Sequence, residues 1–232
     1  MPETLRERRR QELLERVRDI AQQHLVEHGP AALSLRAVAR DAGISVSALY
    51  RYFADRDALL TDLLVRAFDA HAEAVEAALE AAGEAAGEAL PAALRAYRAW
   101  AVAHPAEFGL AYGTPVPGYH APADRTIRAG ARIGDCLQGV LAREYEKGAV
   151  AAAAVEAREA DLAASTREQL ETLRERRGYA GPVGLTALGI DLFVTLHGFV
   201  VMEVFGQLRP VTPDAGPYFE EILAAELARL TG

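Results

Sequence analysis

Lysine, cysteine and tryptophan are nearly absent from this sequence of 232 residues. Lys147, Cys136 and Trp100 are the only residues of their types, and aromatic residues make up 7% of the chain. A single cysteine excludes an intramolecular disulfide, and we expect a reducing, cytoplasmic setting. The sequence shows neither a second thiol nor a motif that lowers a thiol pKa. We therefore interpret Cys136 as a small buried hydrophobic residue rather than a redox sensor.

The sequence also lacks the motifs of an enzyme or a metal site. It contains no phosphate-binding loop and no nucleophile elbow. His104, His120 and His197 are too far apart for the short spacing of metal ligands, so we expect neither metal nor cofactor. Asp191, His197 and Glu203 are each six residues apart and diverge around a helix, at about 100° per residue. An enzyme is therefore the interpretation that the sequence favours least.

Targeting signals are missing as well. The N-terminus has no apolar core of a signal peptide. The longest apolar run, residues 185–208, has the length of a membrane span, but it contains Asp191 and Glu203, which are costly in lipid. We expect a buried interface helix there and no membrane partner.

Alternating strand patterns are absent, whereas alanine is abundant and 51% of the residues are hydrophobic. This composition predicts an all-α fold with enough apolar surface for one large or two modest domains. Two short helices are expected between residues 34 and 53, and Pro/Gly-rich connections at 112–124 and 178–184. The expected longer helices are 3–28, 56–83, 88–103, 125–145, 150–177, 185–208 and 218–230.

The first short helix begins the most informative segment, residues 33–60. Ser34 is a suitable N-cap for this helix, and Gly43 ends it where a left-handed residue costs least. Its apolar positions fall on one face: Leu35, Val38, Ala39 and Ala42. Two caps, a glycine turn and a second short helix together predict a helix-turn-helix.

The second short helix would be the recognition helix. Ser45 can cap it, and Leu49 and Phe53 form its inward pair. The pattern leaves five residues facing mostly outward near its start: Val46, Ser47, Ala48, Tyr50 and Arg51. Small side chains let a helix N-terminus approach base edges, while hydroxyl and guanidinium groups reach phosphates. The alternative is an ordinary helical hairpin with a solvated face.

At these residues the sequence resembles the DNA-binding domain of the tetracycline-repressor (TetR) family of bacterial regulators. The match covers about the first fifty to seventy residues: Ser34, Arg36, Val38, Ala39, Ala42, Gly43, Ile44, Ser45, Ser47, Leu49, Tyr50, Tyr52, Phe53, Arg56, Leu59 and Leu60. Val46 departs from the polar residue common at its position, and Arg56 replaces the usual lysine. The resemblance implies these DNA-binding residues: Ser34, Arg36, Val46, Ser47, Ala48, Tyr50, Arg51, Tyr52 and Arg56.

The charge distribution fits a DNA-binding N-terminal part. The whole chain has a net charge of −8, yet residues 1–66 hold 11 arginines against 10 acidic residues. Four arginines lie near the N-terminus: Arg6, Arg8, Arg9 and Arg10. They form either a flexible arm that can reach phosphate or a minor groove, or a solvated helix start. Such a charge split implies modest non-specific affinity for DNA.

The last two predicted helices suggest a second copy of the chain as partner. One apolar stripe lies on a helix with little remaining chain to cover it: Phe219, Ile222, Leu223, Leu227 and Leu230. A four-helix interface between two copies would use residues 185–208 and 217–230. An intramolecular core would use the same residues. The symmetry of a helix-turn-helix protein, which reads two half-sites, favours the homodimer.

The C-terminal part resembles the TetR-type domain class named for a Trp-His-Gly signature. His197 and Gly198 match the signature, whereas Phe193 stands where its tryptophan would fall. That class implies a ligand-sensing and dimerising domain. We expect a small-molecule pocket lined by Trp100, Phe108, Tyr112, Tyr119, Phe193, His197 and Met202. Each of these residues, taken singly, fits a core role better than a ligand contact.

Together these features predict a three-helix DNA-binding head over residues 1–56 and a helical-bundle body for ligand sensing and dimerisation over 57–232. The expected function is a ligand-responsive transcriptional regulator, by family default a repressor, which binds a palindromic double-stranded DNA operator as a dimer. An unknown small molecule would release it. The alternative from another class is a helical scaffold or interaction protein without sequence-specific DNA binding.

Overall fold

The computed structural model describes residues 4–83, 85 and 87–231. Within these residues the chain forms eleven α-helices and one short 3-10 helix, with no strand. The all-α prediction is confirmed. The chain divides into two compact units: a head unit of residues 1–69 and 104–130, and a body unit of residues 70–103 and 131–232. The functional division between residues 56 and 57 stays a prediction.

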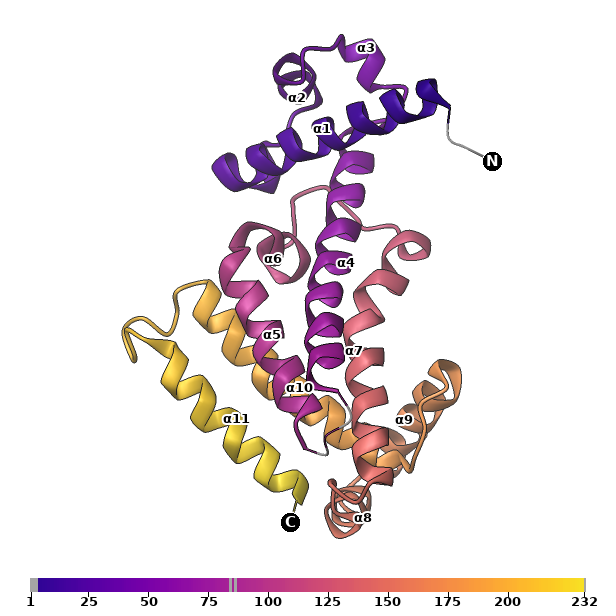
Figure 1. Cartoon of the computed structure of the whole chain (residues 1–232), viewed down its shortest axis with the longest axis vertical. Coiled ribbons are helices and arrows are strands. Elements are labelled where there is room, and N and C mark those ends of the chain that lie inside the picture. Colours follow the sequence, from indigo (N-terminus) through magenta and orange to yellow (C-terminus); the bar gives the residue numbers. More distant parts are fainter. Residues whose placement is uncertain (1–3, 84, 86, 232) are drawn as a thin grey trace. The chain divides into compact units, whose positions relative to one another are not determined.

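The head unit contains the predicted helix-turn-helix (Figure 1). Its elements are α1 (Leu5–His28), η1 (Pro30–Ala32), α2 (Leu35–Asp41), α3 (Val46–Leu49), the first half of α4 (Arg56–Ala82), α6 (Pro105–Tyr112) and the first turns of α7 (Ala123–Glu146). The predicted start of the first helix at Glu3 lies outside the described residues. Thr4 caps α1 by a capping box, in which the Thr4 hydroxyl accepts from the Glu7 amide and the Glu7 carboxylate accepts from the Thr4 amide.

The recognition helix is shorter than the sequence predicts. The structure ends α3 at Leu49, because the amides of Arg51 and Tyr52 bond to carbonyls three residues back and tighten the turn. The Phe53 amide still bonds to the Leu49 carbonyl, and both side chains are buried, so the inward pair is confirmed. The Ser45 hydroxyl caps α3 as expected. Ser34 occupies the N-cap position of α2 but makes no side-chain capping bond.

One hydrophobic core holds the head unit together. Its buried residues come from α1 to α4, from the short connections between these helices and from the connection after α6: Val17, Ala21, Leu25, Leu33, Leu35, Val38, Ala39, Ala42, Leu49, Phe53, Leu59, Leu60, Leu63 and Val116. Ala106 and Leu110 of α6 pack against this core, as does Tyr119. The segment 104–130 is therefore part of the head's core, although it lies far along the chain from the helix-turn-helix.

The body unit is built around α10, which packs against α5, α8, α9 and α11. Besides the rest of α4 and α7, the unit comprises α5 (Ala89–Ala103), α8 (Ala152–Ala160), α9 (Ala164–Arg177), α10 (Val183–Val204) and α11 (Ala215–Thr231). The single helix predicted for 150–177 is wrong. The chain turns after Ala160, which lets Leu162 bury itself against Val183 and Ala187 of α10. The short helix α6 was also not predicted.

By length and composition alone, α10 is apolar enough to cross a membrane, and half of its most apolar window is buried within the protein. A core helix of a soluble protein passes the same test. Asp191 and Glu203 of α10 form ion pairs with Arg158 and Arg98. These contacts fit the predicted packing helix.

Two glycines let neighbouring helices approach α10 closely. A Cβ on Gly184 would collide with the Val155 carbonyl oxygen of α8 and come within 2.9 Å of the Glu159 Cβ. A Cβ on Gly189 would collide with the Gln138 amide of α7. The contact between α8 and α10 therefore requires a residue without a side chain at Gly184.

We predict opposite effects for two helical Gly→Ala substitutions in the body unit. Gly184→Ala should lower the free energy of unfolding by about 1–3 kcal/mol, because α8 must move away. Gly139→Ala in α7, where a Cβ meets no atom within 4 Å, should raise it by about 0.5–1 kcal/mol. Urea unfolding at one fixed protein concentration measures both. Equal effects would show that α8 and α10 are not in this close contact.

Candidate nucleic-acid interface

The helix α3 is held by its buried side and exposes the opposite side (Figure 1). Leu49 and Phe53 anchor it in the head core, with 0% and 5% of their surfaces exposed. Tyr50, between them in the sequence, is 51% exposed, and Arg51 is exposed as well. The burial of Leu49 and Phe53 therefore leaves a hydroxyl group and a guanidinium group exposed in the turn directly after α3.

The start of α3 carries polar and small side chains. The Ser45 hydroxyl accepts a bond from the Ala48 amide at 3.2 Å and lies 3.0 Å from the Ser47 hydroxyl. Ser47 is exposed, whereas Val46 and Ala48 are half-buried. These small side chains leave the first turn of α3 open to a close approach by another molecule, as base-edge recognition requires.

All nine predicted DNA-binding residues lie in the head unit. Four are exposed (Arg36, Ser47, Tyr50 and Arg51), and five are half-buried (Ser34, Val46, Ala48, Tyr52 and Arg56). Their contacts with DNA stay predictions.

Arg56 has a structural role that sequence reasoning missed. Its guanidinium group donates from Nε to the Leu33 carbonyl at 3.1 Å, and from Nη2 to the carbonyls of Pro30 and Ala31 at 2.8 and 3.1 Å. Arg56 is the first residue of α4, so these bonds hold the start of α4 against the turn before α2. Arginine provides several donors in a fixed plane, which the usual lysine at this position lacks.

Ion pairs tie α1 to α4 within the head unit. Arg18 donates to Asp62 through Nε and Nη2, at 2.8 and 2.9 Å. Arg66 donates to Glu15 at 2.6 Å and holds the pKa of that carboxyl below its ordinary value. The negative charges between α1 and α4 are thus compensated, so they repel a polyanion less than their number suggests.

The predicted ligand-pocket residues are divided between the two units. Phe108, Tyr112 and Tyr119 belong to the head unit. The rings of Phe108 and Tyr112 are 4.9 Å apart, Phe68 meets Tyr112 edge-on at 5.6 Å, and the Tyr119 hydroxyl lies 3.0 Å from that of Thr61. This part of the predicted set therefore contributes to packing on α4.

The other four residues belong to the body unit, where three of them join one aromatic cluster. His71 stacks between Tyr97 and Trp100, with both centroid distances 4.3 Å. The Tyr97 hydroxyl lies 2.6 Å from His197 Nδ1, and Phe193 stacks on His197 at 5.2 Å. Burial lowers the pKa of His197, so its ring is neutral at pH 7. Met202, the fourth residue, is 42% exposed.

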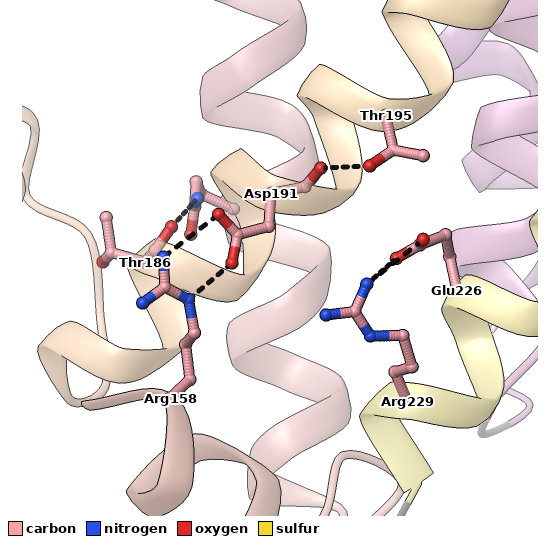
Figure 2. Close-up of polar contacts among 7 residues, drawn as sticks. Arg158, Thr186, Asp191, Thr195, Glu226 and Arg229 are labelled. Carbon is pink, nitrogen blue, oxygen red and sulfur yellow. Dashed lines mark hydrogen bonds and ion pairs between the residues drawn. The ribbon is translucent and has the colours of Figure 1, made fainter. Parts of the chain in front are cut away.

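Groups that an enzyme on α10 would need do not converge. Figure 2 shows the Asp191 carboxylate paired with Arg158 of α8, and the Asp191 carbonyl accepting from Thr195 on the same helix. Glu203 pairs instead with Arg98 of α5 at 2.7 Å. Among the described residues no group of three His, Cys, Asp or Glu side chains is placed to hold a metal.

Cys136 is half-buried rather than fully buried. Burial raises the pKa of its thiol above the ordinary value. This environment disfavours the reactive thiolate form and fits the structural role expected for the residue.

Two family models match the chain. The model for bacterial regulatory proteins of the tetR family matches residues 17–63, and the model for the tetracyclin repressor-like C-terminal domain matches residues 90–225. The HTH-type transcriptional regulators Rv1816 of Mycobacterium tuberculosis and Mb1846 of Mycobacterium bovis are each 34% identical to this chain over 225 residues, which is 94% of both chains.

Solved structures agree with these matches. The crystal structure of SCO4313, described as a regulatory protein, has a TM-score of 0.76 and 31% identity, and the match covers 98% of each chain. A protein of unknown function from a Rhodococcus species has a TM-score of 0.67 and 26% identity over 94% of this chain and 93% of its own. The TetR family transcriptional regulator PfmR from Thermus thermophilus, at 22% identity and a TM-score of 0.55, shares the fold over 94% of this chain and 98% of its own.

We predict that Arg56 stabilises the head unit. Arg56→Ala should lower its free energy of unfolding by about 1–3 kcal/mol, since three carbonyls lose a charged donor. Arg56→Lys should restore part of the loss, and Arg36→Ala, which removes an exposed arginine, should change stability by less than about 0.5 kcal/mol. Urea unfolding followed by circular dichroism measures all three. Unchanged stability in Arg56→Ala would contradict the structural role.

Proposed function

This chain belongs to the TetR family of helix-turn-helix transcriptional regulators, and on that premise we propose that it is a dimeric, ligand-released repressor of a palindromic operator. It is a DNA-binding regulator and not an enzyme. The palindromic operator and the releasing ligand are what the proposal adds to the family assignment. The cytoplasm, where the DNA lies, is the proposed location.

The observation that carries the proposal is the exposure of one side of α3. Leu49 and Phe53 hold the helix in the head core, and Tyr50 and Arg51 between them are exposed. We propose that α3 enters the major groove, with Ser47 and Ala48 near base edges and with Tyr50 and Arg51 at the backbone or bases. A helical scaffold without DNA binding would have no need of this placement.

The proposed homodimer forms through α10 and α11, within residues 185–208 and 217–230. The stripe predicted to face the partner is largely buried within the single chain, because Phe219, Leu223 and Leu230 of α11 are 1–4% exposed, as the intramolecular alternative expects. Other apolar side chains are exposed on α10, directly after it and on α11: Val194, Met202, Phe205 and Tyr218, which are 42–62% exposed. Exposed apolar residues on adjoining helices are typical of an interface. Two heads held together can read two half-sites about 34–36 Å apart.

The proposed ligand site uses the aromatic residues predicted from the sequence, above all Trp100, Phe193 and His197 of the body unit. Stacked aromatic rings with a hydroxyl and a neutral imidazole offer apolar walls with a few polar groups, as small-molecule sites do. The ligand would bind better to a conformation in which the two recognition helices leave half-site spacing. Operator affinity that no metabolite changes would contradict this part.

Selection from random duplex DNA tests the DNA-binding proposal. We expect the purified protein to enrich a palindrome with half-sites about one helical turn apart. Tyr50→Ala and Arg51→Ala should each weaken binding to the enriched duplex about tenfold or more, since each removes a direct contact. Arg176→Ala, an exposed arginine of the body unit, is the matched control and should bind as the wild type does.

Two outcomes would contradict the proposal. One is the absence of any enriched sequence at every salt concentration, which would favour the scaffold. The other is unchanged affinity in Tyr50→Ala and Arg51→Ala proteins that keep the helical circular dichroism of the wild type, which would show that α3 is not the recognition helix.

A charge placed on the exposed apolar side chains tests the interface. We predict that Val194→Glu with Phe205→Glu gives a monomer of unchanged helicity, because the interface between the two copies would have to bury four carboxylates. Val211→Glu, at a residue 75% exposed outside both interface segments, should stay dimeric. Analytical ultracentrifugation measures the three masses. A dimeric double variant would place the interface elsewhere.

A further inference from the structure

The helix α1 extends beyond the head core at its N-terminal end. The first fully buried residue of α1 is Val17, whereas every residue from Thr4 to Glu12 is exposed. This extension contains Arg6, Arg8, Arg9 and Arg10. The sequence left open whether these arginines form a flexible arm or a helix start, and in the structure they lie on a regular helix that begins at Leu5.

Two of these arginines continue the inward face of the helix. At about 100° per residue, Arg6 and Arg10 fall within about 20° of the direction of Val17, and Arg8 points about 180° away from it. Figure 1 shows α3 beside the N-terminal half of α1. The face of α1 that packs into the head core through apolar residues therefore carries arginines nearer its N-terminus, beyond the end of the core and beside α3.

Arg10 lies directly beside the recognition segment. Its guanidinium carbon is 5.6 Å from the centre of the Tyr52 ring, a cation–π distance. Tyr52 follows Tyr50 and Arg51 in the turn after α3. A cation–π contact uses none of the N–H donors of a guanidinium group, so these donors remain able to bind phosphate oxygens.

Carboxylates of the described residues do not pair with Arg6 or Arg10. Within residues 4–83, no carboxylate lies within ion-pair distance of Arg6 or Arg10. Glu7 caps the helix through Thr4, whose backbone N–H lowers the pKa of that carboxyl, and Glu15 pairs with arginines of α1 and α4. Two positive charges therefore remain available on the α3 side of α1.

We propose that Arg6 and Arg10, with Arg10 over the Tyr52 ring, form a second DNA contact that binds the phosphodiester backbone beside the groove entered by α3. The inference rests on the proposed function, because it places this contact at the edge of the α3 interface. The contact reads no sequence and adds affinity equally to operator and non-operator DNA.

The salt dependence of binding tests this contact. Binding is measured by fluorescence anisotropy at several salt concentrations, with the selected operator duplex and with an unrelated duplex of equal length. Each phosphate contact contributes about 0.9 to the slope of log affinity against log salt. The proposed dimer carries this contact twice, so the double variant Arg6→Gln/Arg10→Gln removes four contacts and should lose about 3.6 units of slope on both duplexes. Its preference for the operator should stay unchanged.

Arg8→Gln is the control, since it removes one arginine charge per chain from the opposite face of the same helix. We expect it to keep the wild-type slope. Two results would overturn the inference, provided that the wild type still selects an operator. One is an unchanged slope in the double variant, and the other is a loss of slope per removed charge in Arg8→Gln equal to that of the double variant. Failure of the wild type to prefer any duplex would instead overturn the proposed function.

Discussion

The burial of Leu49 and Phe53 is the constraint on which the DNA-binding surface depends. The helix α3 has only four residues, too few for a helix to be stable in water through its own hydrogen bonds. Its place is set by two side chains that pack into the core of α1, α2 and α4. Tyr50 and Arg51 are exposed because Leu49 and Phe53 are buried on either side of them, so the geometry of the proposed DNA contact follows from hydrophobic packing.

The same core also includes a segment far along the chain. Val116 is buried in it, Leu110 and Tyr119 pack against it, and Gln22 of α1 donates to Glu107 of α6 at 2.5 Å. A change in the segment 104–130 is therefore a change within the head unit itself. Coupling between the proposed ligand and DNA would need a structural element that both can bias, and α6 with its following connection shares one core with the helix-turn-helix.

Local pattern predicted much of the fold and of the proposed interface. The apolar spacing and the glycines predict α1, α4 and the helix-turn-helix, and the i,i+4 spacing of Leu49 and Phe53 predicts that both are buried while Tyr50 and Arg51 between them are exposed. The carbonyl contacts of Arg56 were not predictable, because their partners lie 23 to 26 residues away. The turn at Leu162 depends on burial against α10, and aromatic residue type does not reveal which unit a ring joins.

Amide hydrogen exchange, with and without the selected operator duplex, tests most directly whether one core unites the DNA-binding helices with the segment 104–130. We predict that the duplex slows exchange in α6 as well as in α1 to α3, because all pack on the same core. Exchange in α9 should not change. Slower exchange in α1 to α3 with unchanged exchange in α6 would contradict the account, since the segment 104–130 would then open independently of the head.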